Sequence, residues 1–151
     1  MITVFFLILG AHVCGDMFVY SPRIAKRKRS GSFLERSKFI SGHAFIHAFF
    51  IWIWLWSYGL YLKISASIYI LIVHFLIDIA RTYYEQKVID EEKFHIFQRK
   101  DIVKLALRKT VSQDTQCFLN QYRFSWLRIN VLDQTFHFLS IFLFVLIWSR
   151  F

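Results

Sequence analysis

The sequence has few of the residues that organise disulfide-rich or loop-rich soluble proteins. Its 151 residues include two cysteines, one proline and five glycines. Cys14 and Cys117 are too few and too far apart for a disulfide framework or a thiolate metal site. The chain also lacks a glycine-rich phosphate loop, a Gly-x-Ser-x-Gly nucleophile motif, internal repeats and low-complexity segments. The residue patterns of most soluble enzymes are therefore absent.

Apolar residues are abundant instead: 56% of the chain is hydrophobic and 20% is aromatic. A soluble domain of this length has too little interior to bury so much apolar surface, whereas a lipid bilayer accommodates it. Four segments are long enough to cross a hydrocarbon core of about 30 Å at about 1.5 Å of rise per residue. They are residues 2–20, 39–62, 64–80 and 131–148. We therefore predict an all-α fold, a single integral membrane domain over residues 1–151 with four transmembrane helices in an up-down bundle.

The first segment lacks the charged start of a signal peptide and ends in GDMFVYSP, so we expect a retained membrane anchor. Of the 19 lysines and arginines, seven lie in the connection 21–38 and ten lie in the connection 81–130. The positive-inside rule predicts that both connections are cytoplasmic and that both termini face the other side.

The connection 81–130 is expected to form cytoplasmic amphipathic helices, with SQDTQ as the break between two of them. Juxtamembrane basic clusters are typical of contacts to anionic lipid, so we expect the lipid bilayer rather than nucleic acid as the partner. A homo-oligomer, or a membrane or cytoplasmic protein partner, stays open. His95 is expected to be an ordinary interfacial histidine.

Each span contains two ionisable residues four positions apart, and this spacing places both side chains on one face of a helix. The pairs are His12 with Asp16, His43 with His47, His74 with Asp78, and Asp133 with His137. The predicted topology brings all of them into the cytoplasmic half of the bundle. Asp16, His43, Asp78 and Asp133 would form a shallow layer, and His12, His47, His74 and His137 a deeper layer about 6 Å further in.

An ionisable group inside a membrane span costs about 3 kcal/mol and is usually paired or functional. No lysine or arginine lies within the four segments, so we expect the aspartates to pair with histidines, protons or a bound cation. Nitrogen and oxygen donors from four helices suit Zn²⁺, Fe²⁺ or Mn²⁺, and all eight residues of the two layers are predicted metal ligands. Asp16 and Asp133 are the predicted catalytic residues, as acceptors of a proton from metal-bound water.

These residues predict a metal-binding inner-membrane protein, and a metal-dependent hydrolase acting on a lipid-like substrate is the reaction considered. Two other functions stay open. One is a proton or divalent-cation path, and the other is a membrane-anchored sensor or partner protein with a structural metal. Interhelical hydrogen bonds without a metal would also explain a single pair.

The segments AHVCGDMFVYSP, GHAFIHA, VHFLID and LDQTFH follow one another across the four hydrophobic segments. In this order they resemble a family of small bacterial multi-pass membrane proteins, domain of unknown function 3307. The resemblance covers nearly the whole chain, and the connection 81–130 is the least matched. The family pattern has a glutamine a few residues after the first aspartate, where this chain has Tyr20. The resemblance implies a bacterial inner-membrane location and the four polar pairs as a set, and it brings no function.

Overall fold

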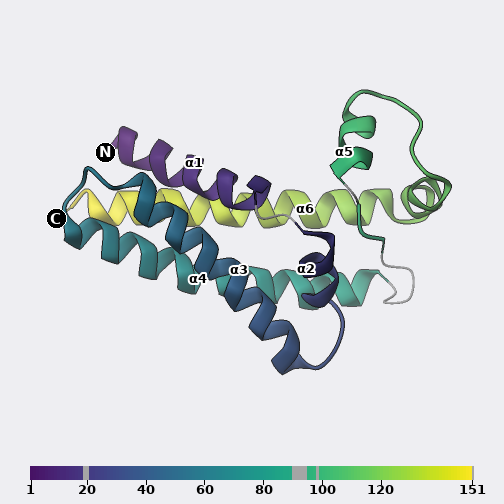
Figure 1. Cartoon of the computed structure of the whole chain (residues 1–151), viewed down its shortest axis with the longest axis horizontal. Coiled ribbons are helices and arrows are strands. Elements are labelled where there is room, and N and C mark those ends of the chain that lie inside the picture. The colour runs from purple at the N-terminus through teal and green to yellow at the C-terminus, as the bar shows by residue number, and fades with distance from the viewer. Residues whose placement is uncertain (19–20, 90–94, 98, 151) are drawn as a thin grey trace.

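The structure is a computed structural model that describes residues 1–18, 21–89, 95–97 and 99–150 (Figure 1). This part of the chain forms α-helices and no strand, which confirms the all-α prediction. The helices are α1 (Ile2–Phe18), α2 (Pro22–Arg27), α3 (Phe33–Trp54), α4 (Leu60–Val88), α5 (Arg99–Ala106) and α6 (Gln113–Trp148).

Four of these helices form a bundle. Going round it, α1 packs against α3, α3 against α4, α4 against α6, and α6 against α1. Both termini lie at one end of the bundle, and α2 and α5 lie towards the other end (Figure 1). The short helix α2 follows α1 and packs against α3.

The start of α3 differs from the predicted start of the second span at residue 39, because a capping box begins the helix earlier. The Ser32 hydroxyl accepts a hydrogen bond from the Glu35 backbone N–H, and the Glu35 carboxylate accepts one from the Ser32 backbone N–H. The Ser32 backbone N–H and the Ser32 hydroxyl both donate to the Glu35 carboxylate, and these contacts lower the pKa of Glu35. Gly31, just before the cap, has a φ of 93°, a conformation that glycine adopts without a steric penalty.

Other helix ends also differ from the ends of the predicted spans. The turn between α3 and α4 spans 55–59 and Leu60 begins α4, whereas the second and third predicted spans are separated at residue 63. The helix α4 continues to Val88, and α6 begins at Gln113, so the connection 81–130 is helical at both ends. The break between α5 and α6 covers 107–112, so Ser112 of SQDTQ ends the break as the N-cap of α6 and the following four residues begin that helix. Hydropathy locates the apolar part of a helix, whereas capping and side-chain partners determine its ends.

Two of the described helices, α4 and α6, are long and apolar enough to cross a membrane. The helix α1 is apolar but shorter, with 17 residues. The first turns of α3 contain Glu35, Arg36 and Lys38. By length and composition, the structure thus supports two of the four predicted spans.

The inner face of each bundle helix changes from apolar to polar at one level. Along α4 the buried residues recur every four positions, from Leu62, Ala66 and Ile70 to His74 and Asp78. The apolar part joins one core cluster with Ile8 of α1, Ile51 of α3 and Ile141 of α6, among others. The polar side chains therefore meet directly beyond this core, on the side of α2.

Candidate metal centre

Four buried histidines, one from each bundle helix, lie against one another at the boundary of the apolar core. They are His12 of α1, His47 of α3, His74 of α4 and His137 of α6, each at most 4% exposed. The ring centroids of His47 and His74 are 4.0 Å apart, those of His74 and His137 4.4 Å, and those of His12 and His47 4.6 Å. The structure therefore brings together the residues of the predicted deeper layer.

Several ring nitrogens of this cluster have no hydrogen-bond partner within the described part of the protein. These atoms are Nδ1 and Nε2 of His12, Nδ1 of His47, Nδ1 and Nε2 of His74, and Nε2 of His137. Leaving one buried polar group unsatisfied costs about 1–3 kcal/mol. Nitrogen lone pairs in such a position are suited to accept a cation.

Asp16 and His43 lie beside the cluster and form a triangle of ligand atoms with His47. The Nε2 atoms of His43 and His47 are 3.2 Å apart. The Oδ1 atom of Asp16 lies 3.5 Å from the first and 3.4 Å from the second. A tetrahedral Zn²⁺ site with bonds of about 2.0–2.1 Å separates its ligand atoms by about 3.3 Å. The triangle thus has the dimensions of one face of such a site.

The same contacts are long for hydrogen bonds between a carboxylate and a charged donor, which are about 2.7–2.9 Å. Ion pairs elsewhere in this structure do reach that length or a shorter one. Lys28 Nζ lies 2.6 Å from Asp78 Oδ2, and Arg81 Nη1 lies 2.7 Å from Asp133 Oδ2. The distances from Asp16 to His43 and His47 are therefore longer than those of the ion pairs and are compatible with ligands that share an ion.

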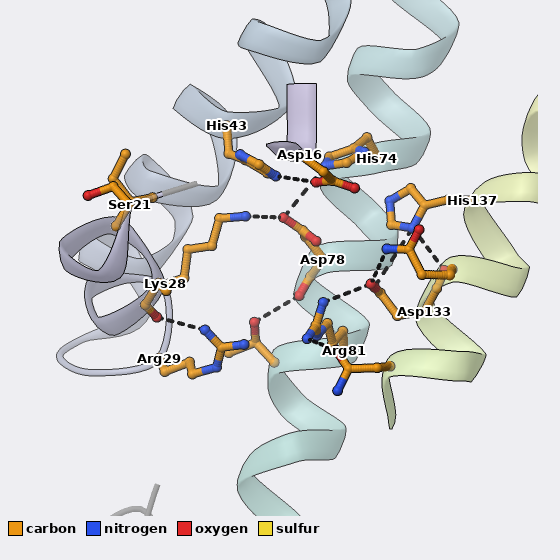
Figure 2. Close-up of a pocket in the computed structure, with 15 residues that line it drawn as sticks. Asp16, Ser21, Lys28, Arg29, His43, His74, Asp78, Arg81, Asp133 and His137 are labelled. Carbon is orange, nitrogen blue, oxygen red and sulfur yellow. Dashed lines mark hydrogen bonds and ion pairs between the residues drawn. The ribbon is translucent and has the colours of Figure 1, made fainter. Parts of the chain in front are cut away.

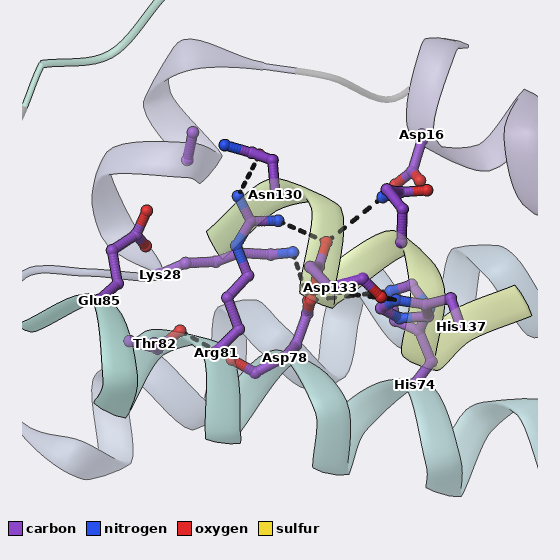
Figure 3. Close-up of polar contacts among 12 residues, drawn as sticks. Asp16, Lys28, His74, Asp78, Arg81, Thr82, Glu85, Asn130, Asp133 and His137 are labelled. Carbon is purple, nitrogen blue, oxygen red and sulfur yellow. Dashed lines mark hydrogen bonds and ion pairs between the residues drawn. The ribbon is translucent and has the colours of Figure 1, made fainter. Parts of the chain in front are cut away.

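The ion pairs of Asp78 and Asp133 correct the expectation that the aspartates have no basic partner (Figure 3). Lys28 comes from the C-cap of α2, and Arg81 lies on α4 just beyond the predicted third span. Arg81 Nη2 also donates to Asn130 Oδ1 at 2.9 Å. Long basic side chains extend well beyond their own backbone position, so a search confined to the spans misses them. Only the basic run in the first connection hinted at Lys28.

These side chains surround a polar cavity of about 250 Å³ between α2 and the bundle (Figure 2). Its wall includes Asp16, Lys28, Arg29, His43, His74, Asp78, Arg81, Asn130, Asp133, Gln134 and His137. Arg29 Nε lies 2.6 Å from Oε2 of Glu85, a buried residue of α4 that the sequence did not single out. The Lys28 and Arg29 ion pairs together tie the end of α2 to α4.

Removing the Lys28 charge is expected to destabilise the fold. Burial lowers the pKa of Lys28 and the contact with Asp78 opposes this shift, so the ammonium and the carboxylate depend on each other. Lys28→Met would leave the Asp78 carboxylate buried without this partner, at a cost of about 3 kcal/mol in the free energy of unfolding. Denaturant titration in detergent measures this change. Lys26→Met is the matched control, because Lys26 is exposed two residues earlier. Equal effects of the two substitutions would contradict the prediction.

His95, which the sequence places outside the predicted site, lies apart from the histidine cluster. Its Nε2 atom is 2.8 Å from Thr115 Oγ1, and its ring packs against Phe97 and Phe118. It thus belongs to a small aromatic cluster beside α6. Tyr20, which stands in the region of the family glutamine, lies outside the described residues.

Comparison with known proteins identifies the family. The family model described as "Protein of unknown function (DUF3307)" matches residues 4–150, so the chain belongs to this family. No curated protein matches the chain, and no solved structure matches it.

Proposed function

We propose that this member of the DUF3307 family binds a divalent transition metal ion, Zn²⁺, Fe²⁺ or Mn²⁺, inside a membrane-embedded four-helix bundle. The observation that carries the proposal is the triangle of Asp16 Oδ1, His43 Nε2 and His47 Nε2, with edges of 3.2–3.5 Å. The buried nitrogens of His12 and His74 lie next to it, and His12, His47 and His74 form a second group of ligand atoms close enough to share an ion.

The surface of the bundle supports the membrane part of the proposal. Large apolar side chains are exposed along α1, α3, α4 and α6, among them Phe6, Phe45, Ile68 and Phe142. In the most apolar 18-residue stretch of each long helix, only 22% of α4 and 28% of α6 is buried inside the protein. Apolar surface of this extent is typical of contact with lipid. We propose four membrane passes in a bacterial inner membrane, with the basic α2 end in the cytoplasm and both termini on the other side.

The chemistry we propose at this centre is hydrolysis of a lipid-like substrate. A metal ion with three protein ligands and one open position lowers the pKa of bound water to about 7 and polarises a substrate oxygen. Asp16 and His43 line the cavity, so a substrate there lies beside two of the proposed ligands. Asp133 lines the same cavity, and its Oδ1 has no hydrogen-bond partner in the described part of the chain. We assign Asp133 as the proton acceptor and Asp16 as a metal ligand.

The buried core argues against a transport path through a single chain. Beyond the histidines the cluster that fills the bundle contains only apolar residues, including Ile8, Ile51, Ile70 and Ile141. Among the described residues, no buried charged or polar side chain lies in that part of the bundle, and the part-buried hydroxyls of Ser67 and Tyr69 donate to backbone carbonyl groups. A binding or catalytic centre in a cavity that ends at the apolar core fits this arrangement better than a path across the bilayer.

The metal content of detergent-purified protein tests the proposal. Wild type is expected to carry near-stoichiometric metal by mass spectrometry, and His47→Ala is expected to lose it, because His47 belongs to both ligand groups. His95→Ala is the matched control, since this histidine lies in the aromatic cluster. The metal proposal fails if wild type stays metal-free after reconstitution with each of the three ions. The membrane part fails if the protein does not sediment with the membrane fraction.

A further inference from the structure

An apolar groove of about 440 Å³ runs between α4 and α6 on the outside of the bundle. Its walls include Leu76, Ala80, Ile129, Leu132 and Phe136. Leu76, Leu132 and Phe136 are 57%, 41% and 55% exposed, so the groove opens to the surroundings of the bundle rather than to its core. Its volume lies in the range of about 300–1,000 Å³ that is typical of ligand pockets.

The groove shares two wall residues, Arg81 and Asp133, with the polar cavity. Apolar and polar binding surfaces therefore meet at a single ion pair. The Arg81 Nε atom is buried and has no hydrogen-bond partner in the part of the chain that the structure describes. Arg81 thus lies at the junction of groove and cavity, where Figure 3 shows it between Asn130 and Asp133.

We propose that groove and cavity together bind one phosphate-bearing acyl lipid, with its chain along α4 and α6 and its phosphate at Arg81. The guanidinium group matches phosphate oxygens in geometry as well as in charge. The amide groups of Asn130 and Gln134 also line the cavity. Each donates one hydrogen bond within the protein, to Trp126 O and Asp133 Oδ2, and has a second N–H. This inference names the substrate class of the proposed centre and rests on the metal proposal. Lys28, Arg29 and Arg81 each already contact one carboxylate, so the proposed metal would supply the positive charge that balances the phosphate.

A second apolar groove on the bundle could hold an acyl chain but lacks the polar cavity beside it. It lies between α1 and α6, has a volume of about 560 Å³, and is lined by Phe5, Phe6, Phe138, Leu139 and Phe142, among others. Among the described residues, no charged side chain lines it. It offers a lipid chain a comparable surface without an arginine for the head group, so it serves as the internal control.

The test is native mass spectrometry of protein reconstituted in phosphatidylcholine bilayers that contain phosphatidic acid as a minor lipid. Wild type is expected to retain one phosphatidic acid molecule. Leu132→Trp fills the α4–α6 groove and is expected to reduce this retention about tenfold, which corresponds to about 1.4 kcal/mol. Leu139→Trp on the same helix fills the control groove and is expected to leave retention unchanged. Ala80→Leu narrows the α4–α6 groove with a smaller side chain and is expected to act in the same direction as Leu132→Trp.

Arg81→Lys keeps a positive charge and removes the guanidinium donors, so it is expected to weaken retention while both grooves stay open. Equal retention in the two tryptophan variants would mean ordinary boundary lipid and would overturn the inference. Preference for phosphatidylcholine, or displacement of the lipid by glycerol phosphate at equal concentration, would overturn it as well. Metal content is measured on the same samples. Wild type that holds metal and neither retains nor hydrolyses phosphatidic acid refutes the lipid site alone, whereas metal-free wild type refutes the proposed function.

Discussion

Gly15→Ala is expected to remove most of the bound metal while leaving the helices intact. A Cβ atom at position 15 would lie 2.6 Å from His47 Nδ1 and 2.7 Å from His47 Cε1, well inside van der Waals contact. His47 is fully buried among the rings of His12, His43 and His74, so a shift of its ring changes its position relative to the other proposed ligands. A metal site holds its ligand distances within about 0.2 Å, and displacement of one imidazole by more than that breaks the ligand set. We expect at least a tenfold loss of Zn²⁺ affinity.

The helix propensity of alanine distinguishes this loss of metal from a loss caused by unfolding of α1. Alanine favours a helix interior by about 1 kcal/mol over glycine, so the substitution itself strengthens α1. The matched control is Gly42→Ala on α3, where an added Cβ atom has no neighbour within 4 Å. Zn²⁺ titration against a chromophoric chelator measures both variants, and circular dichroism verifies their helix content. Wild-type affinity in Gly15→Ala would show that His47 does not hold the metal in this position.

The contact between Gly15 and His47 illustrates what the sequence could not reveal. Spacing at four residues correctly places His12 and Asp16 on one face of α1, because that relation depends only on helix geometry. The approach of α1 to α3 at Gly15 depends on how two helices pack, and nothing in the local sequence specifies it. The same limit applies to Lys28, whose partner Asp78 is 50 residues away in the chain.

The helix ends also depend on contacts that the sequence pattern does not reveal. The apolar stretches predicted the bundle because an apolar face must be covered, either by protein or by lipid. They did not predict that α4 continues to Val88, since that end is stabilised by polar contacts. Arg29 and Arg36 reach Glu85 and Gln86 there, and Thr82 donates to the Asp78 carbonyl oxygen. Such contacts have no hydropathy signal.

Asp16→Asn is expected to abolish tight metal binding, whereas Asp78→Asn is expected to retain it. The two carboxylates belong to the same predicted layer, but their surroundings differ. Asp78 contacts the Lys28 ammonium at 2.6 Å, so its charge is already compensated. Asp16 has no lysine or arginine contact among the described residues and faces Nε2 atoms of His12, His43 and His47 at 3.4–3.6 Å. A neutral amide keeps an oxygen at position 16 and removes the negative charge that attracts the cation.

The expected loss in Asp16→Asn exceeds the 10–100-fold that is typical of residues that only orient a ligand. Zn²⁺ competition titration measures this loss, and thermal unfolding in the same detergent reports the folded state. Asp78→Asn should show the opposite profile, with Zn²⁺ affinity near that of wild type and a lower unfolding temperature, because it deprives the buried Lys28 of its counter-charge. If Asp78→Asn lost the metal and Asp16→Asn kept it, the ion would belong to one of the two groups that contain Asp78, either with His43 and His74 or with Asp133 and His137. The two variants therefore decide which side of the histidine cluster holds the metal.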